Sequence, residues 1–97
     1  MSKLGLLVRL EAKPGKEKEV ANFIKNALPL AIEEMNTLTW YSFRIDNNTF
    51  GIYDTFSNEE GRMAHLQGKI AQQLMTSASE LLATEPIIEK LDILASK

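Results

Sequence analysis

Hydrophobic and polar positions along the 97 residues divide the chain into short strands and amphipathic helices. Residues 4–12 are rich in Leu and Val and precede the turn signal Lys13-Pro14-Gly15, which predicts a first strand. From Lys16 to Met35, apolar residues recur every three or four positions, which is the period of a helix. Pro29 lies inside that helix and lacks a backbone donor, so we expect a kink near residues 25–29.

The middle of the chain predicts a β-hairpin. Residues 37–45 and 49–56 are β-branched and aromatic, and they flank the tight-turn signal Asp46-Asn47-Asn48. Ser57 and Glu60 have the spacing of a capping box, with Ser57 as the N-cap of a helix that runs to about residue 67.

The last third predicts a second helical run and a final strand. Gly68 can end or bend the preceding helix, and residues 69–83 again repeat with helical period. Thr84-Glu85-Pro86 stops that run, and residues 87–94 read as a strand. The resulting order, β-α-β-β-α-β, predicts an α+β fold of ferredoxin-like type with an antiparallel sheet, formed by one domain over residues 1–97.

Alternation along the hairpin predicts two different sheet faces. If Ile45 pairs with Phe50, one face is almost wholly apolar and belongs under the helices; it carries Tyr41, Phe43, Ile45, Phe50, Ile52, Asp54 and Phe56. The other face carries Trp40, Ser42, Arg44, Gly51, Tyr53 and Thr55. Large exposed aromatic patches usually mark an interface or a ligand groove, so we expect a homodimer formed through this sheet face.

Composition narrows the classes of function. The net charge is −2 with mixed signs, and a nucleic-acid surface normally needs a basic patch. The absence of cysteine excludes disulfides, thiolate metal sites and a cysteine nucleophile. The apolar run near the N-terminus is too short for a signal peptide or a membrane span, so we expect a cytoplasmic protein without membrane contact.

One stretch, FGIYDTFSNEEGRMAHLQ, resembles the antibiotic biosynthesis monooxygenase (ABM) family of dimeric α/β barrels. The residues that match its motif are Phe50, Tyr53, Asp54, Phe56, Ala64 and His65. The resemblance implies a homodimeric barrel and the oxidation of a small phenolic, quinol or anthrone-like aromatic by molecular oxygen. It also implies that no metal, flavin or haem cofactor takes part. Residues 68–71 lack the histidine ligand of haem-degrading relatives.

Six residues are candidates for the site. His65 and Tyr53 are the catalytic candidates, His65 as a base or as a donor to a developing enolate. Trp40, Arg44, Phe50 and Asp54 are the substrate-binding candidates, and no metal ligands are expected. Structural roles compete with these: a helix-end histidine, an interface tryptophan, an arginine ion pair, and an aspartate satisfied by nearby backbone amides.

Two other functions compete with an oxygenase. A non-catalytic dimeric barrel that binds a small hydrophobic ligand fits the same residues. RNA-binding domains share the element order, but they need a Lys/Arg-Gly before the aromatic strand, and Asp54 stands where they have a hydrophobic residue. Fold alone does not decide between the oxygenase and the ligand-binding barrel, because one fold hosts many functions.

Overall fold

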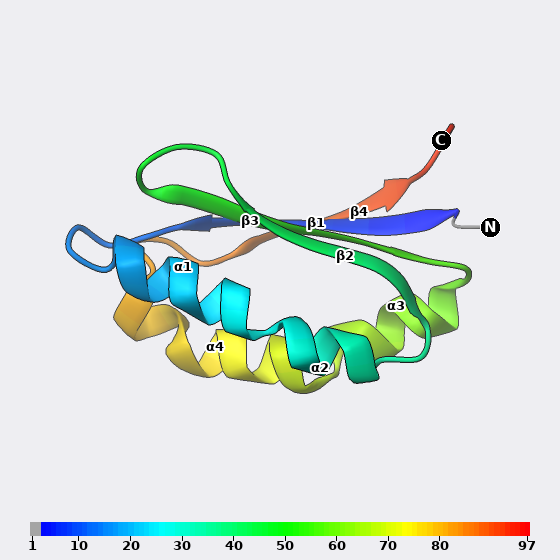
Figure 1. Cartoon of the computed structure of the whole chain (residues 1–97), viewed down its shortest axis with the longest axis horizontal. Coiled ribbons are helices and arrows are strands. Elements are labelled where there is room, and N and C mark those ends of the chain that lie inside the picture. Colours follow the sequence, from blue (N-terminus) through cyan, green and yellow to red (C-terminus); the bar gives the residue numbers. More distant parts are fainter. Residues whose placement is uncertain (1–2) are drawn as a thin grey trace.

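A computed structural model describes residues 3–97 and shows one antiparallel sheet with helices on one side (Figure 1). The strand order in the sheet is β2-β3-β1-β4. The strands are β1 (Leu4–Glu11), β2 (Thr37–Arg44), β3 (Thr49–Phe56) and β4 (Ile87–Asp92). The predicted α+β, ferredoxin-like order is therefore confirmed, with each helical segment divided in two.

Proline and glycine produce these divisions. The first segment breaks at Ala27 into α1 (Glu17–Asn26) and α2 (Leu28–Glu33), as the predicted kink required. Pro29 lies in the first turn of α2, where a missing N–H costs little. The second segment breaks at Gly68, which separates α3 (Glu59–Leu66) from α4 (Lys69–Leu81). Within residues 3–97, no helix has the length and apolar character to cross a membrane.

The predicted N-cap of α3 was wrong by one residue. Asn58, not Ser57, is the N-cap: its side-chain oxygen accepts a hydrogen bond from the Gly61 backbone N–H at 2.8 Å. Asn58 has the extended backbone that an N-cap needs, and asparagine caps at least as well as serine.

The register of the β2–β3 hairpin also differs from the prediction by one residue. Arg44, not Ile45, pairs with Phe50. Ile45 lies in the turn, where its N–H donates to the Thr49 carbonyl at 2.8 Å. The Asp46 carboxylate accepts the N–H of Thr49 at 2.9 Å and closes this turn. A slip of one residue moves every side chain of a strand to the opposite face.

The two faces of β2 are therefore exchanged relative to the prediction, while those of β3 are as predicted. Trp40 lies on the helix-covered face, and Tyr41 and Phe43 lie on the open face with Tyr53. The rings of Tyr41 and Tyr53 stack with their centroids 6.3 Å apart. The Phe43 ring lies over Gly51, where an added Cβ would be 2.5 Å from Cζ, so Gly51 leaves room for this ring.

Two hydrophobic clusters fill the space between sheet and helices. The larger joins β1, β3, α1 and α4 through Val8, Leu10, Ala12, Val20, Ile24, Phe50, Ile52, Leu74 and Leu82. The smaller joins Ala27, Ala31 and Ile70. Trp40 is partly buried and packs against both clusters, so the observed register turns the largest side chain of the strand toward the core.

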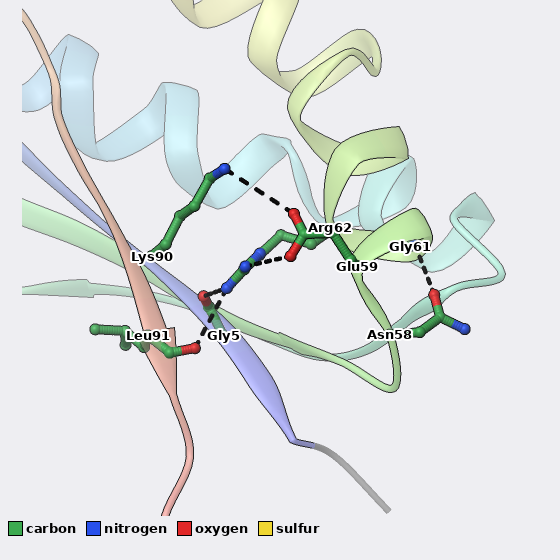
Figure 2. Close-up of polar contacts among 7 residues, drawn as sticks. All are labelled: Gly5, Asn58, Glu59, Gly61, Arg62, Lys90 and Leu91. Carbon is green, nitrogen blue, oxygen red and sulfur yellow. Dashed lines mark hydrogen bonds and ion pairs between the residues drawn. The ribbon is translucent and has the colours of Figure 1, made fainter.

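A buried arginine fastens α3 to the sheet (Figure 2). Arg62 is 6% exposed, and its Nη1 donates to the backbone carbonyls of Gly5 and Leu91, each at 3.3 Å. Its Nη2 forms an ion pair with Glu59 one turn earlier, and Lys90 Nζ lies 4.0 Å from the same carboxylate. One side chain therefore ties α3 to both β1 and β4.

Replacing this arginine should destabilise the fold. Arg62→Met keeps the apolar stem but leaves two carbonyls and the Glu59 carboxylate without their donor, so we expect a loss of about 2–3 kcal/mol in the free energy of unfolding. Urea titration followed by far-UV circular dichroism measures it. Lys18→Met, on an exposed residue of α1 in the helical layer, is the control and should change stability by less than about 0.5 kcal/mol. Equal losses in the two variants would contradict the assigned role of Arg62.

Candidate functional site

His65, the only histidine of the chain, lies between two carboxylates. Its Nδ1 is 2.5 Å from Oε1 of Glu34, and its Nε2 is 2.7 Å from Oδ2 of Asp54. Glu34 is the C-cap of α2, Asp54 belongs to β3, and His65 lies in the last turn of α3. We call Glu34, His65 and Asp54 the acid–histidine triad; it joins both helical segments to the sheet.

Local structure fixes each member of the triad. The chain leaves α2 at Glu34 in an extended conformation, and the Thr37 hydroxyl donates to Glu34 Oε1 at 2.8 Å. The Phe56 ring packs against the imidazole with centroids 5.4 Å apart. A Cβ at Gly68 would lie 3.2 Å from Glu34 Oε2, so the glycine that separates α3 from α4 also leaves space for this carboxylate.

Electrostatics favours a protonated histidine. Burial of the imidazole opposes protonation, but the hydrogen bonds and charges of Asp54 and Glu34 outweigh it and raise the pKa of His65 to about 9. Burial also raises the pKa of Asp54, and its contact with His65 partly offsets that rise. The raised pKa of His65 keeps its proton bound well past neutral pH. Asp54 is fully buried and His65 is 7% exposed, so this proton lies in the interior.

A surface hollow of about 270 Å³ opens beside the triad. Its lining comes from the end of α2, one side of α3 and the first residues of α4, and includes Leu30, Met35, Ala64, Gly68 and Lys69. Glu34 and His65 line it as well, whereas Asp54 lies behind them. Glu34 is the most accessible triad member, with a side chain 20% exposed. The hollow therefore has mixed walls: Leu30, Met35 and Ala64 are apolar, Glu33, Asn36 and Lys69 are polar, and Glu34 and His65 add a carboxylate and an imidazolium.

The structure brings together only part of the predicted site. His65 and Asp54 are in contact, and Phe50 is a core residue, 1% exposed. Arg44 lies over the Phe50 ring, 4.9 Å from its centroid, rather than beside His65. Tyr53 is on the open face of the sheet, opposite to Asp54.

Two features of the site differ from what the sequence suggested. Asp54 is partnered by His65 itself, not by backbone amides near Ser57 or Arg62. Glu34 was not among the candidates, because a glutamate at the end of an amphipathic helix carries no local signal that it faces a histidine 31 residues later. Only the packing of α2 beside α3 shows that Glu34 contacts His65.

The triad does not have the character of a metal centre. Both imidazole nitrogens face carboxylate oxygens, so neither is free to ligate. In the part of the chain that the structure describes, no group of three or more histidine, cysteine, aspartate or glutamate side chains could hold a metal ion.

The raised pKa of His65 predicts how stability depends on pH. The folded protein keeps its proton up to about pH 9, whereas the unfolded chain loses it near the ordinary value of 6.5. The stabilisation is therefore complete below pH 6.5, falls as pH rises and is lost above about pH 9, a change on the order of 3–4 kcal/mol. Urea unfolding between pH 6 and pH 10 measures it. His65→Gln should flatten the curve across this window, and an unchanged slope in that variant would contradict the assignment.

Comparisons with known proteins place this fold in a wider group. No family model matches the chain, and no curated protein does either. Among solved structures, NE2512 from Nitrosomonas europaea, a protein of unknown function, is 50% identical, with a TM-score of 0.98 over 100% of this chain and 94% of that one.

More distant structures share the fold. A protein from Caulobacter crescentus named as a putative antibiotic biosynthesis monooxygenase is 16% identical, with a TM-score of 0.81 over 97% of this chain and 92% of that one. A Bacteroides thetaiotaomicron protein described as a possible oxidoreductase is 20% identical, with a TM-score of 0.79 over 95% and 98%. The chain therefore belongs to the same family as NE2512 and has the fold of the proteins named as antibiotic biosynthesis monooxygenases.

Proposed function

We propose that this protein is a cofactor-independent monooxygenase that oxidises a small phenolic, quinol or anthrone-like aromatic with molecular oxygen. The observation that carries the proposal is the acid–histidine triad on the wall of a surface hollow with both apolar and polar lining residues. The fold is shared with proteins named as monooxygenases, and that likeness supports the reaction class only by analogy.

The protein's task in such a reaction is to remove a proton and to shelter the anion. With His65 protonated, the triad carries one net negative charge and can accept one further proton. Glu34 is the carboxylate at the hollow, so in this proposal Glu34 takes the hydroxyl proton of the substrate. The His65 imidazolium next to it stabilises the aromatic anion, and Leu30, Met35 and Ala64 offer apolar contacts to its ring.

Electrons then pass from the substrate anion to oxygen. For an anthrone-like substrate, a ring methylene becomes a carbonyl, one oxygen atom enters the product and the other leaves as water. The electron-rich anion is itself the reductant, so the protein supplies binding and proton transfer. His65 acts here as the charged partner of Glu34 rather than as a free base, since both its nitrogens are engaged.

A second candidate is a non-catalytic barrel that binds a small hydrophobic ligand. The engagement of both imidazole nitrogens favours it, because a purely structural ion-pair cluster would have the same geometry. The hollow would then bind its ligand through Leu30, Met35 and Ala64 without oxygen chemistry.

Assembly is part of the proposal. The open face of the sheet carries the stacked Tyr41 and Tyr53 together with Phe43, and Tyr41 is 56% exposed. An aromatic patch on an uncovered sheet face is suited to packing on a second copy. We therefore propose a homodimer through the open face, in which Tyr53 serves the interface rather than the hollow.

Oxygen uptake tests the function. Metal-free protein should consume oxygen with hydroquinols or anthrones, and Glu34→Gln should lower the rate about 100-fold or more by removing the proton acceptor. Glu60→Gln, an exposed acid of α3, is the matched control and should keep wild-type activity. Uptake no faster than the uncatalysed background across the panel would reject the oxygenase and favour the ligand-binding barrel.

Sedimentation velocity tests the assembly. Tyr41→Arg puts a charge in the centre of the proposed interface, so the variant should sediment as a monomer where the wild type sediments as a dimer. Ile32→Arg makes the same change on α2, where the side chain is 72% exposed on the helical layer, and should leave the dimer intact. A monomeric wild type, or a dimer that survives Tyr41→Arg, would contradict the proposed interface.

A further inference from the structure

We propose that Trp40 and Asp54 form a buried binding site for one hydroxyl group, at the inner end of the acid–histidine triad. The indole Nε1 of Trp40 is buried and has no hydrogen-bond partner among the described residues. The Oδ1 of Asp54 is in the same condition; its Oδ2 lies 2.7 Å from His65 Nε2 but likewise makes no hydrogen bond of good geometry. A donor and an acceptor are thus left unmatched in one region of the interior.

Register places the two residues side by side. Trp40 and Asp54 are direct partners across the antiparallel β2–β3 pair, and both lie on the helix-covered face. Side chains directly opposite each other in such a pair have Cβ atoms about 5 Å apart. The indole N–H and the free carboxylate oxygen therefore belong to the same small volume between sheet and helices.

The free-energy cost of an unmatched buried polar atom implies a hydrogen-bond partner for both Trp40 Nε1 and Asp54 Oδ1. A buried donor or acceptor without a hydrogen bond costs about 1–3 kcal/mol, and more for a charged group. Asp54 is fully buried, so bulk solvent does not supply this partner. A hydroxyl group can accept from the indole N–H and donate to the carboxylate at the same time, which neither a cation nor a purely accepting group can do.

The group that fits this site is thus a hydroxyl. It can belong to an internal water or to a substrate. An internal water needs little space and two to four polar partners, and the site offers two. The hydroxyl of an aromatic substrate is the other source, and this arm rests on the proposed function. Leu30 connects the two regions, because it lines the hollow and also packs in the cluster that Trp40 contacts.

A crystal structure of the protein at a resolution that shows ordered water tests the site. An oxygen within hydrogen-bond distance of both Trp40 Nε1 and Asp54 Oδ1 is the expected result and identifies water as the occupant. After soaking with phenol, replacement of that oxygen by the phenol oxygen would identify the substrate hydroxyl. A direct hydrogen bond between Nε1 and Oδ1, or both atoms turned to other protein groups, would overturn the proposal.

Solution measurements distinguish binding through the hydroxyl group from binding through the aromatic ring alone. Trp40 is the only tryptophan, so its indole N–H gives a single NMR signal. If the substrate hydroxyl occupies the site, phenol should shift this signal saturably and bind about 5–10-fold more tightly than anisole, which has no hydroxyl proton to donate. If water occupies it, the signal should show a cross-peak to a long-lived water and ignore both compounds. A signal with neither response would overturn the proposal.

Trp40→Phe removes only the N–H donor and is the matched variant. It should lose the bridging oxygen from the crystal structure, or lower phenol affinity by about 5–10-fold, while the His65 contacts remain. An oxygen still bound at Asp54 in the same place, or unchanged phenol affinity, would overturn the role of Trp40. None of these readouts involves oxygen consumption, so failure of the oxygenase and failure of this site are distinguishable.

Discussion

A carboxylate buried among apolar side chains is the constraint on which this structure depends. Asp54 lies among Leu6, Ile52 and Phe56, where an isolated negative charge would be costly. His65 is the cation that compensates it, and Glu34 in turn holds the other nitrogen of the imidazole. Because these residues belong to β3, α3 and α2, the need to neutralise one charge fixes where both helical segments lie on the sheet.

The order of elements could be read from the sequence because it depends on local signals. Hydrophobic periodicity, Pro29, Gly68 and the turn around residues 46–48 each mark a boundary that is set within a few residues. The sequence did not determine which side chains of β2 face the helices. A turn longer by one residue reverses the two faces of this strand, and the choice depends on how Trp40 fits between clusters contributed by distant helices.

The candidate site shows the same division between local and tertiary information. Asp54 and His65 are 11 positions apart on a strand and the helix that follows, so the sequence could suggest that they meet. Glu34 belongs to an earlier helix and reaches His65 only through packing. Tyr53 was a candidate through the family motif, but strand alternation places it on the open face with Tyr41, opposite to Asp54 and His65.

The pairing of β1 with β4 has a consequence for how the chain folds. Leu4 pairs with Asp92, so β1, an internal strand of the sheet, lacks one neighbour until β4 is available. The β2–β3 hairpin, in contrast, closes over a few residues and can form early. During synthesis, β4 and the carbonyl of Leu91 that Arg62 contacts emerge after the other strands and all the helices, which makes docking of α3 against the complete sheet a late event. A ribosome-bound chain that ends before residue 87 would hold the triad residues but lack the strand that completes their support.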